Sequence, residues 1–576
     1  MCDKLKHGGP DDEGFYTDTE NHLVLGHRRL ALIDLSPGGH QPMSYDEERY
    51  WISYNGELYN YLEIKEELIK AGYHFKSASD TEVILAAFAA WGTHAFRRFN
   101  GMFAFALWDT EKKELYLVRD CSGIKPLYFA VTTEGLVYAS EVRALKILPW
   151  LQKENKQWPV YLLAYGHLPE PITTLQEVKP LPKGCFLRYR AGDESWDIES
   201  FAFYSYTEQL GNRDEAMALI AESLQKAVQR HLISDAPIGV FLSGGIDSGI
   251  LALLAAGYHK EQLKTLSIDF EEKQFSEKKY QDLLLDKLNC EHWQGVLTKT
   301  EFEKHLPGII AAMDLPGCDG INTWFISKYA KESGLKAVLS GLGGDELFGG
   351  YPSFKRMGRV NMLEQAPRFL LRTGQYFGSK KLQRLTNLSF GNTRGAYLFL
   401  RGQLIPPAIA AQLDASEAEV WRVLQQAPAF HDLNSLSPGN QASWLETNMY
   451  MQNQLLRDSD VMSMAHGIEI RVPFLDRDFV NLVLRIKSGE KYAGLLPKQL
   501  LIDSFKTLLP EPVWNRPKMG FTFPFAQWMA DNELVQDSMA AMGSRGELNY
   551  NKFKKGEMHW SQLMSLILVQ QYADAA

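Results

Sequence analysis

One segment constrains the fold of this 576-residue chain more than any other, the run Ala236–Leu254. Its first part, Ile238–Leu242, is short and apolar, which is typical of a buried strand in a parallel sheet. The Ser-Gly-Gly turn at 243–245 has no Cβ at two successive positions, so a ligand can approach the backbone closely. Apolar residues at helical spacing follow from Ile246, and the N-terminus of a helix attracts anions. The segment therefore predicts a phosphate site.

A second segment of the same kind lies about a hundred residues further on. Leu335–Leu339 is a second apolar stretch, and it leads into Ser340–Tyr351, which is rich in glycine and contains Asp345 and Glu346. Asp247 stands in the first turn of the earlier helix. A carboxylate and bound phosphates are both negatively charged, so they lie close together only if a cation such as Mg²⁺ is between them. We expect Asp247 and Asp345 to share one Mg²⁺. The alternative is that these acids only stabilise a helix start or a tight turn.

Between the two loops, strand and helix patterns alternate. Lys264–Phe270 and His292–Leu297 are predicted strands, and Ser276–Asn289 and Glu301–Met313 are predicted helices. This alternation indicates an α/β fold with a doubly wound parallel sheet. From about residue 355 onward the apolar spacing is mostly helical.

Several motifs resemble those of known enzymes. Ser243–Ser248 resembles the SGGxDS signature of the N-type ATP pyrophosphatases, which cleave ATP to AMP and pyrophosphate while activating an acceptor as its adenylate. Over nearly its whole length the chain is similar to the glutamine-hydrolysing asparagine synthetases. The motifs that carry this resemblance are Gly9–Gly14, His27–Leu30, Tyr54–Asn60, Ser79–Leu85, Asn100–Ala106, Arg119–Tyr128, Leu456–His466, Arg471–Asp476 and Arg516–Phe521.

The resemblance implies two domains. Residues 1–200 would form a class II glutamine amidotransferase-like glutaminase domain, an α+β four-layer αββα N-terminal-nucleophile sandwich. Residues 201–576 would form the synthetase domain, an α/β doubly wound parallel sheet like the adenine nucleotide alpha hydrolases, with additional helices. We expect the polar stretch Arg188–Trp196 to end the last strand of the first domain, and Asn212 to begin the helix that leads into the second.

The resemblance also implies roles for individual residues. A cysteine nucleophile uses its own free α-amino group as the base, and donors stabilise the oxyanion. For the glutaminase these residues are Cys2 as nucleophile, Asn55 and Gly56 in the oxyanion hole, Arg29 at the glutamine α-carboxylate, and Glu57 and Asp80 at its α-ammonium group. For ATP they are Leu242, Ser243, Gly244, Gly245, Asp247, Ser248, Ile268, Ser340 and Gly341, with Asp247 and Asp345 on Mg²⁺. Lys518 would stabilise the charge of the reacting phosphate, and Lys498 is a second candidate for that role.

The N-terminus departs from the family pattern. Family members begin Met-Cys-Gly-Ile and reach a His-Arg-Gly-Pro-Asp motif about thirty residues later, whereas here His7–Asp11 follows Cys2 after only four residues. We expect Met1 to fall inside the family's first helix, so that the first strand is missing, Cys2 is a helix residue and glutaminase activity is weak or absent. The alternative is that removal of Met1 exposes Cys2 as the nucleophile.

The acceptor loop departs as well. In aspartate-using relatives this loop reads Ser-Gly-Glu-Gly, and here Leu342 stands in place of the Glu, which an apolar side chain cannot replace. Asp319–Phe325 is a candidate lining of the acceptor pocket. We expect an ATP-dependent, amide-forming carbon–nitrogen ligase that acts on aspartate first of all. The alternatives are a β-lactam-synthetase-like ligase or amidotransferase acting on another carboxylate, and a catalytically silent binding subunit.

The composition indicates which kinds of partner and which cellular compartment to expect. The five cysteines are odd in number and have no C-x-x-C spacing, so neither a disulfide framework nor a zinc site is indicated. A net charge of −9 argues against a nucleic-acid partner. No apolar run is long enough for a membrane span. We therefore expect a cytoplasmic enzyme, possible as a homodimer, that uses ATP and Mg²⁺ with small-molecule substrates and neither nucleic acid nor membrane as partner.

Overall fold

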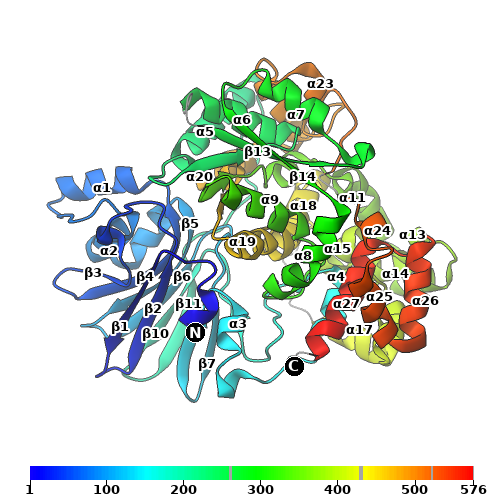
Figure 1. The fold of residues 1–576 in the computed structure, drawn as a ribbon, viewed down its shortest axis with the longest axis horizontal. Coiled ribbons are helices and arrows are strands. Elements are labelled where there is room, and N and C mark those ends of the chain that lie inside the picture. Colours follow the sequence, from blue (N-terminus) through cyan, green and yellow to red (C-terminus); the bar gives the residue numbers. More distant parts are fainter. Residues whose placement is uncertain (259–262, 427–432, 521–522, 575–576) are drawn as a thin grey trace.

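The computed structural model describes residues 1–258, 263–426, 433–520 and 523–574 of the chain. In that part, the strands before residue 201 pair antiparallel and those after it pair parallel, and the two groups occupy different sides of the molecule (Figure 1). The antiparallel sheets of the N-terminal half and the parallel sheet of the C-terminal half confirm this much of the sequence-based expectation.

The N-terminal half is built on a six-stranded antiparallel sheet in the order β11-β10-β6-β5-β4-β3. Its strands are β3 (Met43–Tyr45), β4 (Tyr50–Leu58), β5 (Gly101–Asp109), β6 (Glu114–Arg119), β10 (Cys185–Arg190) and β11 (Ser195–Ser200). Helices α1 (Tyr61–Lys70) and α2 (Asp80–Trp91) cover one face, and an aromatic-rich core that includes Phe96, Phe103 and Phe105 fills the space beneath them.

The opposite face of this sheet packs on two smaller sheets. One contains β1 (Asp12–Asp18) and β2 (Leu23–Arg29), and the other has the order β8-β7-β9, with β7 (Tyr128–Thr132), β8 (Gly135–Ala139) and β9 (Lys179–Pro180). A second apolar core joins them to β5 and β6 through residues such as Leu25, Trp108 and Phe129. A 3₁₀ turn, Cys2–Leu5, precedes β1 and contacts β2 and the short helix α3 (Val142–Leu145).

One expectation about this half is wrong. The polar stretch Arg188–Trp196 does not end the last strand, because β10 runs to Arg190 and β11 begins at Ser195. The stretch is the turn of a hairpin, and the two strands pair from Cys185–Ser200 to Arg190–Ser195. Polar, glycine-containing sequences mark a tight turn within a sheet as readily as a domain end.

The C-terminal half contains a five-stranded parallel sheet in the order β14-β13-β12-β15-β16. The strands are β12 (Ile238–Phe241), β13 (Lys264–Phe270), β14 (Glu291–Leu297), β15 (Ala337–Leu339) and β16 (Glu469–Arg471). The strands predicted at 238–242, 264–270, 292–297 and 335–339 are confirmed within two residues at each end. Figure 1 shows α5 (Arg213–His231) and α6 (Ile246–Tyr258) above this sheet and α9 (Ile321–Glu332) below it.

The predicted helices of this half are also found. Asn212 caps α5, and α8 (Lys299–Ala312) matches its prediction closely, whereas α7 (Lys278–Leu285) is shorter than the predicted 276–289. Trp444–Leu456 is helical, but its main part is a π-helix, Glu446–Leu456. The remaining helices are α4 (Trp158–Tyr165), α10 (Gly344–Phe348), α11 (Pro352–Leu363), α12 (Arg368–Arg372), α13 (Lys380–Gln383), α14 (Leu385–Leu388), α15 (Asn392–Arg401), α16 (Pro406–Leu413), α17 (Glu417–Gln426), α18 (Pro438–Leu445), α19 (Arg457–Met464), α20 (Arg477–Arg485), α21 (Ser488–Lys491), α22 (Gln499–Phe505), α23 (Glu511–Trp514), α24 (Phe525–Trp528), α25 (Glu533–Ala541), α26 (Gly543–Lys554) and α27 (Trp560–Asp574).

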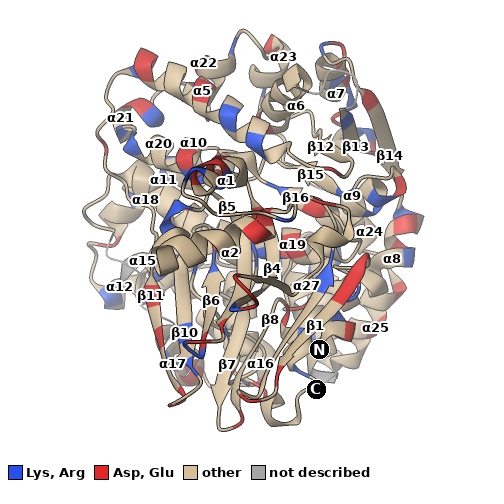
Figure 2. Cartoon of the chain, turned by 90° about the vertical axis from the view of Figure 1, so that its left-hand side faces the viewer, with Lys and Arg blue, Asp and Glu red and all other residues tan. Residues whose placement is uncertain are grey.

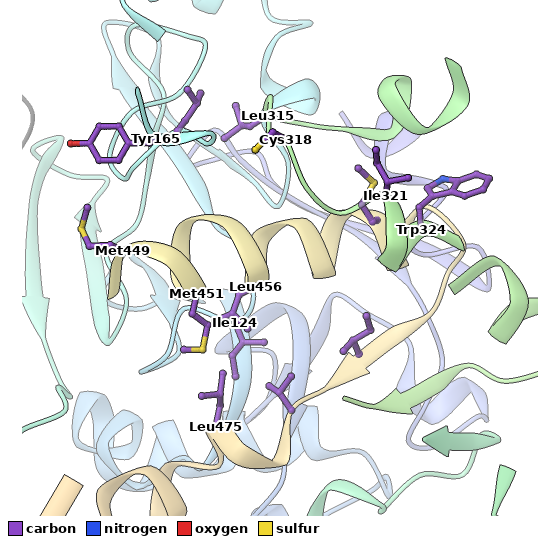
Figure 3. Close-up of a cluster of buried hydrophobic side chains, with 14 of the residues drawn as sticks. Ile124, Tyr165, Leu315, Cys318, Ile321, Trp324, Met449, Met451, Leu456 and Leu475 are labelled. Atoms are coloured by element: carbon purple, nitrogen blue, oxygen red, sulfur yellow. The ribbon is translucent and has the colours of Figure 1, made fainter. Parts of the chain in front are cut away.

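The two halves share one apolar core. Ile124 of the N-terminal half lies beside Met451 and Leu456 of the C-terminal half (Figure 3). Polar contacts reinforce this junction, and one of them is the ion pair between Lys125 Nζ and Asp460 Oδ1, 3.0 Å apart and largely buried. Removal of apolar surface from water on this scale holds the halves in one fixed relation.

The outer surface carries both signs of charge. Figure 2 shows that Lys and Arg positions and Asp and Glu positions are interspersed along the ribbon of both halves, which agrees with the modest net charge of −9. Among the helices in the described ranges, none is both long and apolar enough to cross a membrane.

Candidate functional site

The topology of the parallel sheet places one crevice at its centre. β12 is hydrogen-bonded to β13 on one side and to β15 on the other, so the chain reverses its winding direction between β12 and β15. Ligands of open α/β sheets bind at the carboxyl ends of the strands at such a switch point. The two glycine loops, at 243–248 and 340–345, follow these two strands and therefore meet at the crevice.

A cavity of about 600 Å³ opens there, and we call it the loop cavity. Its lining includes all but one of the predicted ATP and metal residues, together with both candidate lysines. These lining residues are Leu242, Ser243, Gly245, Asp247, Ser248, Ile268, Ser340, Gly341, Asp345, Lys498 and Lys518. Gly244 lies behind the surface: its positive φ of 76° turns the loop. The sequence motif thus brings both loops to one cavity.

Local hydrogen bonds hold the first loop open around that cavity. The Ser248 hydroxyl accepts a hydrogen bond from Ser243 N at 3.2 Å and lies 3.0 Å from the Ser243 hydroxyl. α6 begins at Ile246, so its first-turn N–H groups face the same space. The loop is a preformed cradle for an anionic group.

Two carboxylates and two lysines meet at the junction of the loops. Lys498 Nζ lies 2.7 Å from Asp247 Oδ2 and 2.8 Å from Asp345 Oδ1, and Lys518 Nζ lies 2.7 Å from Asp345 Oδ2. Burial raises the pKa of Asp247 even though Lys498 opposes the shift. For Asp345 the two lysines outweigh burial and lower the pKa to about 2. Asp345 therefore carries negative charge that the two lysines balance, and Lys498 favours the charged form of Asp247 against the effect of burial.

The glycines of the second loop make room for these carboxylates. A Cβ on Gly344 would lie 2.6 Å from Asp247 Cγ, and a Cβ on Gly350 would lie 1.8 Å from Asp345 Oδ1. Side chains at these positions would displace the acids. The glycine pattern of the second loop is thus explained by close packing against the two acids rather than by a turn alone.

One pair that the sequence reasoning did not single out supports the first loop from outside. Arg516 Nη2 donates to the Gly244 carbonyl at 3.0 Å and lies 2.8 Å from Glu277 Oε1, and the guanidinium stacks 3.7 Å from the centre of the Tyr280 ring. The signal was present, because Arg516 belongs to the same motif as Lys518. Phe521, the last residue of that motif, lies outside the described residues.

Part of the lining of the loop cavity is acidic and polar. Asp319, Asn322 and Thr323, from the segment that the sequence offers as a candidate acceptor pocket, line this cavity near the start of α9, and Leu342 lines it from the second loop. Burial raises the pKa of Asp319. Burial, with help from the charge of Asp345, also raises the pKa of Glu346, to about 7. The lining of the loop cavity therefore combines buried acids with an apolar side chain, Leu342.

A second cavity, of about 700 Å³, lies in the N-terminal half, and we call it the N-terminal cavity. It opens between β2 and β8, against β4 and β5. The structure brings together every residue predicted for glutamine. These are Cys2, Arg29, Asn55, Gly56, Glu57 and Asp80.

The charged groups of the N-terminal cavity are held by specific partners. The Arg29 guanidinium donates to the carbonyls of Ile33, Asp34 and Ser36, and within the described ranges it forms no ion pair with a carboxylate. Its positive charge is oriented but not neutralised, as a carboxylate site requires. Asp80 accepts from Leu58 N and the Tyr54 hydroxyl, both at 2.9 Å, and burial raises its pKa.

Cys2 and the backbone of β4 stand at the other end of this cavity. Burial raises the pKa of the Cys2 thiol, and the Cys2 carbonyl accepts from Arg28 Nε at 3.3 Å. Asn55 Nδ2 donates to the Ser140 hydroxyl at 3.4 Å. Cys2 lies in a 3₁₀ turn, consistent with the expectation that it is a helical residue.

The two cavities share a wall. Asp460 and Met464 of α19 line the N-terminal cavity, whereas Asp458 and Ser459 of the same helix line the loop cavity. In β16, Glu469 belongs to the first and Ile470 to the second. One helix and one strand therefore separate two sites that arise from opposite ends of the sequence.

The chain is similar to known proteins along nearly all of its length. A family model described as asparagine synthase matches residues 219–559, and one described as a glutamine amidotransferase domain matches residues 1–202. The chain is 32% identical to glutamine-hydrolysing asparagine synthetase 1 of Bacillus subtilis, over 93% of this chain and 85% of that protein. It is 29% identical to asparagine synthetase 3 of the same organism, over 94% and 87%. A solved allosteric regulatory enzyme of purine biosynthesis overlaps 47% of this chain and 66% of its own, at 14% identity and a TM-score of 0.25, too low to support an argument.

Proposed function

The chain belongs to the asparagine synthase family, and from that premise we propose that it makes asparagine from aspartate in a reaction driven by ATP. The enzyme class is that of a carbon–nitrogen ligase of the glutamine-hydrolysing asparagine synthase type. The observation that carries the proposal is the meeting of Asp247, Asp345, Lys498 and Lys518 between two glycine loops at the switch point of the sheet.

In the proposed reaction the aspartate side-chain carboxylate attacks the α-phosphorus of ATP, and pyrophosphate leaves from the loop at 243–248. Ammonia then attacks the acyl carbon of the adenylate, and AMP leaves as the amide forms. Lys518 is the more exposed of the two lysines, and its ammonium group would stabilise the negative charge that develops on the reacting phosphate. Lys498 forms ion pairs with both Asp247 and Asp345 and so offsets their negative charge.

The donor set at the loop junction fits a divalent cation. Asp247 Oδ1 is a buried oxygen that lacks a hydrogen-bond donor within the described ranges, whereas Asp345 Oδ1 is buried against Lys498 Nζ at 2.8 Å. Carboxylate oxygens are the ligands that Mg²⁺ prefers. Asp247 and Asp345 would hold the Mg²⁺ ion, which supplies neutralisation of the ATP phosphate charge. Lys498 would then exchange its carboxylate contacts for contacts with the nucleotide.

For the nitrogen source we propose a glutamine site in the N-terminal cavity. Arg29 would pair with the α-carboxylate, Glu57 and Asp80 with the α-ammonium group, and Asn55 with the Gly56 N–H would face the amide oxygen. Cys2 is the candidate nucleophile, but it is the first residue of a 3₁₀ turn and burial disfavours its thiolate. We therefore propose free ammonium as the more effective donor for this polypeptide, with residues 1–200 and 201–576 as the two functional domains.

For the acceptor, Leu342 is the residue that sets this chain apart from the aspartate-using pattern. It packs against the core at the rim of the loop cavity, where it supplies no charge. Because this charge is missing, the second candidate acceptor is a carboxylate other than aspartate. The polar group at 319–323 suits an acceptor that, like aspartate, carries an ammonium group near its carboxylate.

The test measures AMP and asparagine formed from ATP, aspartate and Mg²⁺, with either ammonium or glutamine as nitrogen source. Asparagine from ammonium supports the synthetase, and asparagine from glutamine in addition restores Cys2 as a working nucleophile. ATP–pyrophosphate exchange with other carboxylates but not with aspartate would favour the second candidate. Absence of exchange with every carboxylate would overturn the ligase itself.

A further inference from the structure

Arg471 is bound from several directions at the wall between the two cavities. Its side chain is fully buried. Nη2 lies 3.1 Å from Glu57 Oε1, Nε lies 2.9 Å from Glu469 Oε1, and Nη1 donates to the carbonyls of His231 and Ile233 at 2.9 and 2.5 Å. The guanidinium is therefore fixed in place, and Glu57 is its partner in the N-terminal half.

The backbone of the same residue reaches the other cavity. Arg471 ends β16 and stands opposite Leu339 in the pairing with β15. Its carbonyl accepts a hydrogen bond from Ser340 N at 2.8 Å. Ser340 is the first residue of the second glycine loop and lines the loop cavity. A single residue thus contacts a wall group of each cavity, one through its side chain and one through its backbone.

Charge makes this connection sensitive to ligands. Glu57 lines the N-terminal cavity and is almost entirely buried; burial raises its pKa well above the usual range, and the Arg471 guanidinium, 3.1 Å away, is the group that most favours its charged form. A cationic group that enters beside Glu57 competes with the guanidinium for the carboxylate. Arg471 is also bound to Glu469 of β16, so a loss of its ion pair with Glu57 would shift the end of that strand. Ser340 N donates to the Arg471 carbonyl at this end, so the shift would reach the second glycine loop.

We propose that Arg471 is a positioning residue that couples the two cavities, so that an amino acid bound at Glu57 changes the affinity of the loop cavity for ATP. The inference rests on the proposed function for the identity of the two ligands, glutamine and ATP. Coupling of this kind is reciprocal: ATP changes the affinity for glutamine by the same factor.

The experiment measures binding alone, because hydrolysis of glutamine is not needed. Calorimetry gives the Kd of the α,β-methylene analogue of ATP with Mg²⁺, first without and then with saturating glutamine. In the unaltered chain we expect the two Kd values to differ by at least about fivefold. In Arg471→Lys, which keeps the charge but loses the fork of donors, we expect the ratio to fall within about twofold of unity.

Arg477→Lys is the matched control. Arg477 also crosses between the halves, since it donates to the Phe99 carbonyl at 2.9 Å, but it lines neither cavity. We expect it to keep the wild-type ratio. Glu469→Gln removes the ion pair of Arg471 with Glu469 and should bring the ratio of the two Kd values closer to unity. This variant replaces Arg471→Lys in the experiment if Arg471→Lys does not fold.

The outcomes separate this inference from the proposed function. If glutamine and the ATP analogue each bind but do not affect one another in the unaltered chain, the coupling is refuted and the ligase is untouched. An unchanged ratio in Arg471→Lys refutes the role of Arg471. If glutamine does not bind at all, both the coupling and the proposed glutamine site are refuted.

Discussion

Lys498 and Asp247 stand 251 residues apart in the sequence, yet the lysine Nζ lies 2.7 Å from the carboxylate Oδ2. Asp345 completes the group at 2.8 Å from the same nitrogen. Against the effect of burial, the two acids raise the pKa of Lys498, so the ammonium form is the one that is present. The lysine therefore contacts both of the acids that we propose as ligands of Mg²⁺.

Removal of that lysine should expose the acids to a cation even without nucleotide. The lysine ammonium repels a cation that binds beside it, and two like unit charges about 4 Å apart repel by about 4 kcal/mol at an effective dielectric of 20. We therefore expect Lys498→Met, which lacks the ammonium, to bind Mn²⁺ more than about tenfold tighter than the unaltered chain in the absence of ATP. Electron paramagnetic resonance of Mn²⁺ measures this directly. Lys226→Met, on the exposed face of α5, is the control. Equal Mn²⁺ affinity in Lys498→Met and the unaltered chain would contradict the prediction.

Substitution of Cys2 should leave synthesis from ammonium unchanged. Because burial raises the pKa of the Cys2 thiol and so disfavours the nucleophilic thiolate, we expect glutamine to support slower synthesis than ammonium. Cys2→Ala should then alter neither rate. The measurement is asparagine formed per minute with each nitrogen source. A glutamine rate that equals the ammonium rate and disappears in Cys2→Ala would show that the thiol works.

Gly56 should tolerate no side chain. Its φ is 145°, and a Cβ there would lie 2.1 Å from the Met102 carbonyl oxygen on the neighbouring strand. We expect Gly56→Ala to lower the free energy of unfolding by about 2 kcal/mol or more and to weaken glutamine binding. Urea unfolding measures the first effect. Gly72→Ala is the control, because Gly72 also has a positive φ but meets nothing within 4 Å, and it should cost less.

Lys491 should make stability depend on pH. It is fully buried, and burial lowers its pKa from 10.5 to about 7. Between these values the unfolded chain holds the proton and the folded chain has lost it. Unfolding therefore takes up a proton, and the free energy of unfolding rises with pH by up to about 1.4 kcal/mol per unit.

Lys491→Met removes this contribution. The slope of the urea midpoint between pH 7.5 and 9 should be flatter in the variant than in the unaltered chain, as expected from the same linkage. Lys70→Met, at an exposed site on α1, should leave the slope as it is. Parallel slopes for Lys491→Met and the unaltered chain would mean that Lys491 keeps its proton when buried.

Much of the C-terminal half was predictable because its signals are local. A short apolar strand, a glycine turn and an amphipathic helix are each written in a few neighbouring residues, so β12, β13 and the two loops were found within a residue or two. The expectation that Asp247 and Asp345 lie close together followed from their place at strand ends, and both contact Lys498. The errors also have local causes: a polar hairpin turn at 188–196 was read as a domain end, and α7 stops before the predicted helix does.

Residue types and their order along the chain determined which chemistry this protein can perform, because a phosphate loop, its acids and the members of a glutamine site are all recognisable as short patterns. Only the tertiary structure decided which of these groups meet. The contact of Lys498 with both acids, the pairing of Arg471 with Glu57, and the division of α19 between two cavities depend on packing between segments hundreds of residues apart. Such contacts leave no periodicity in the sequence, since they are selected by the burial of a shared core rather than by any local preference.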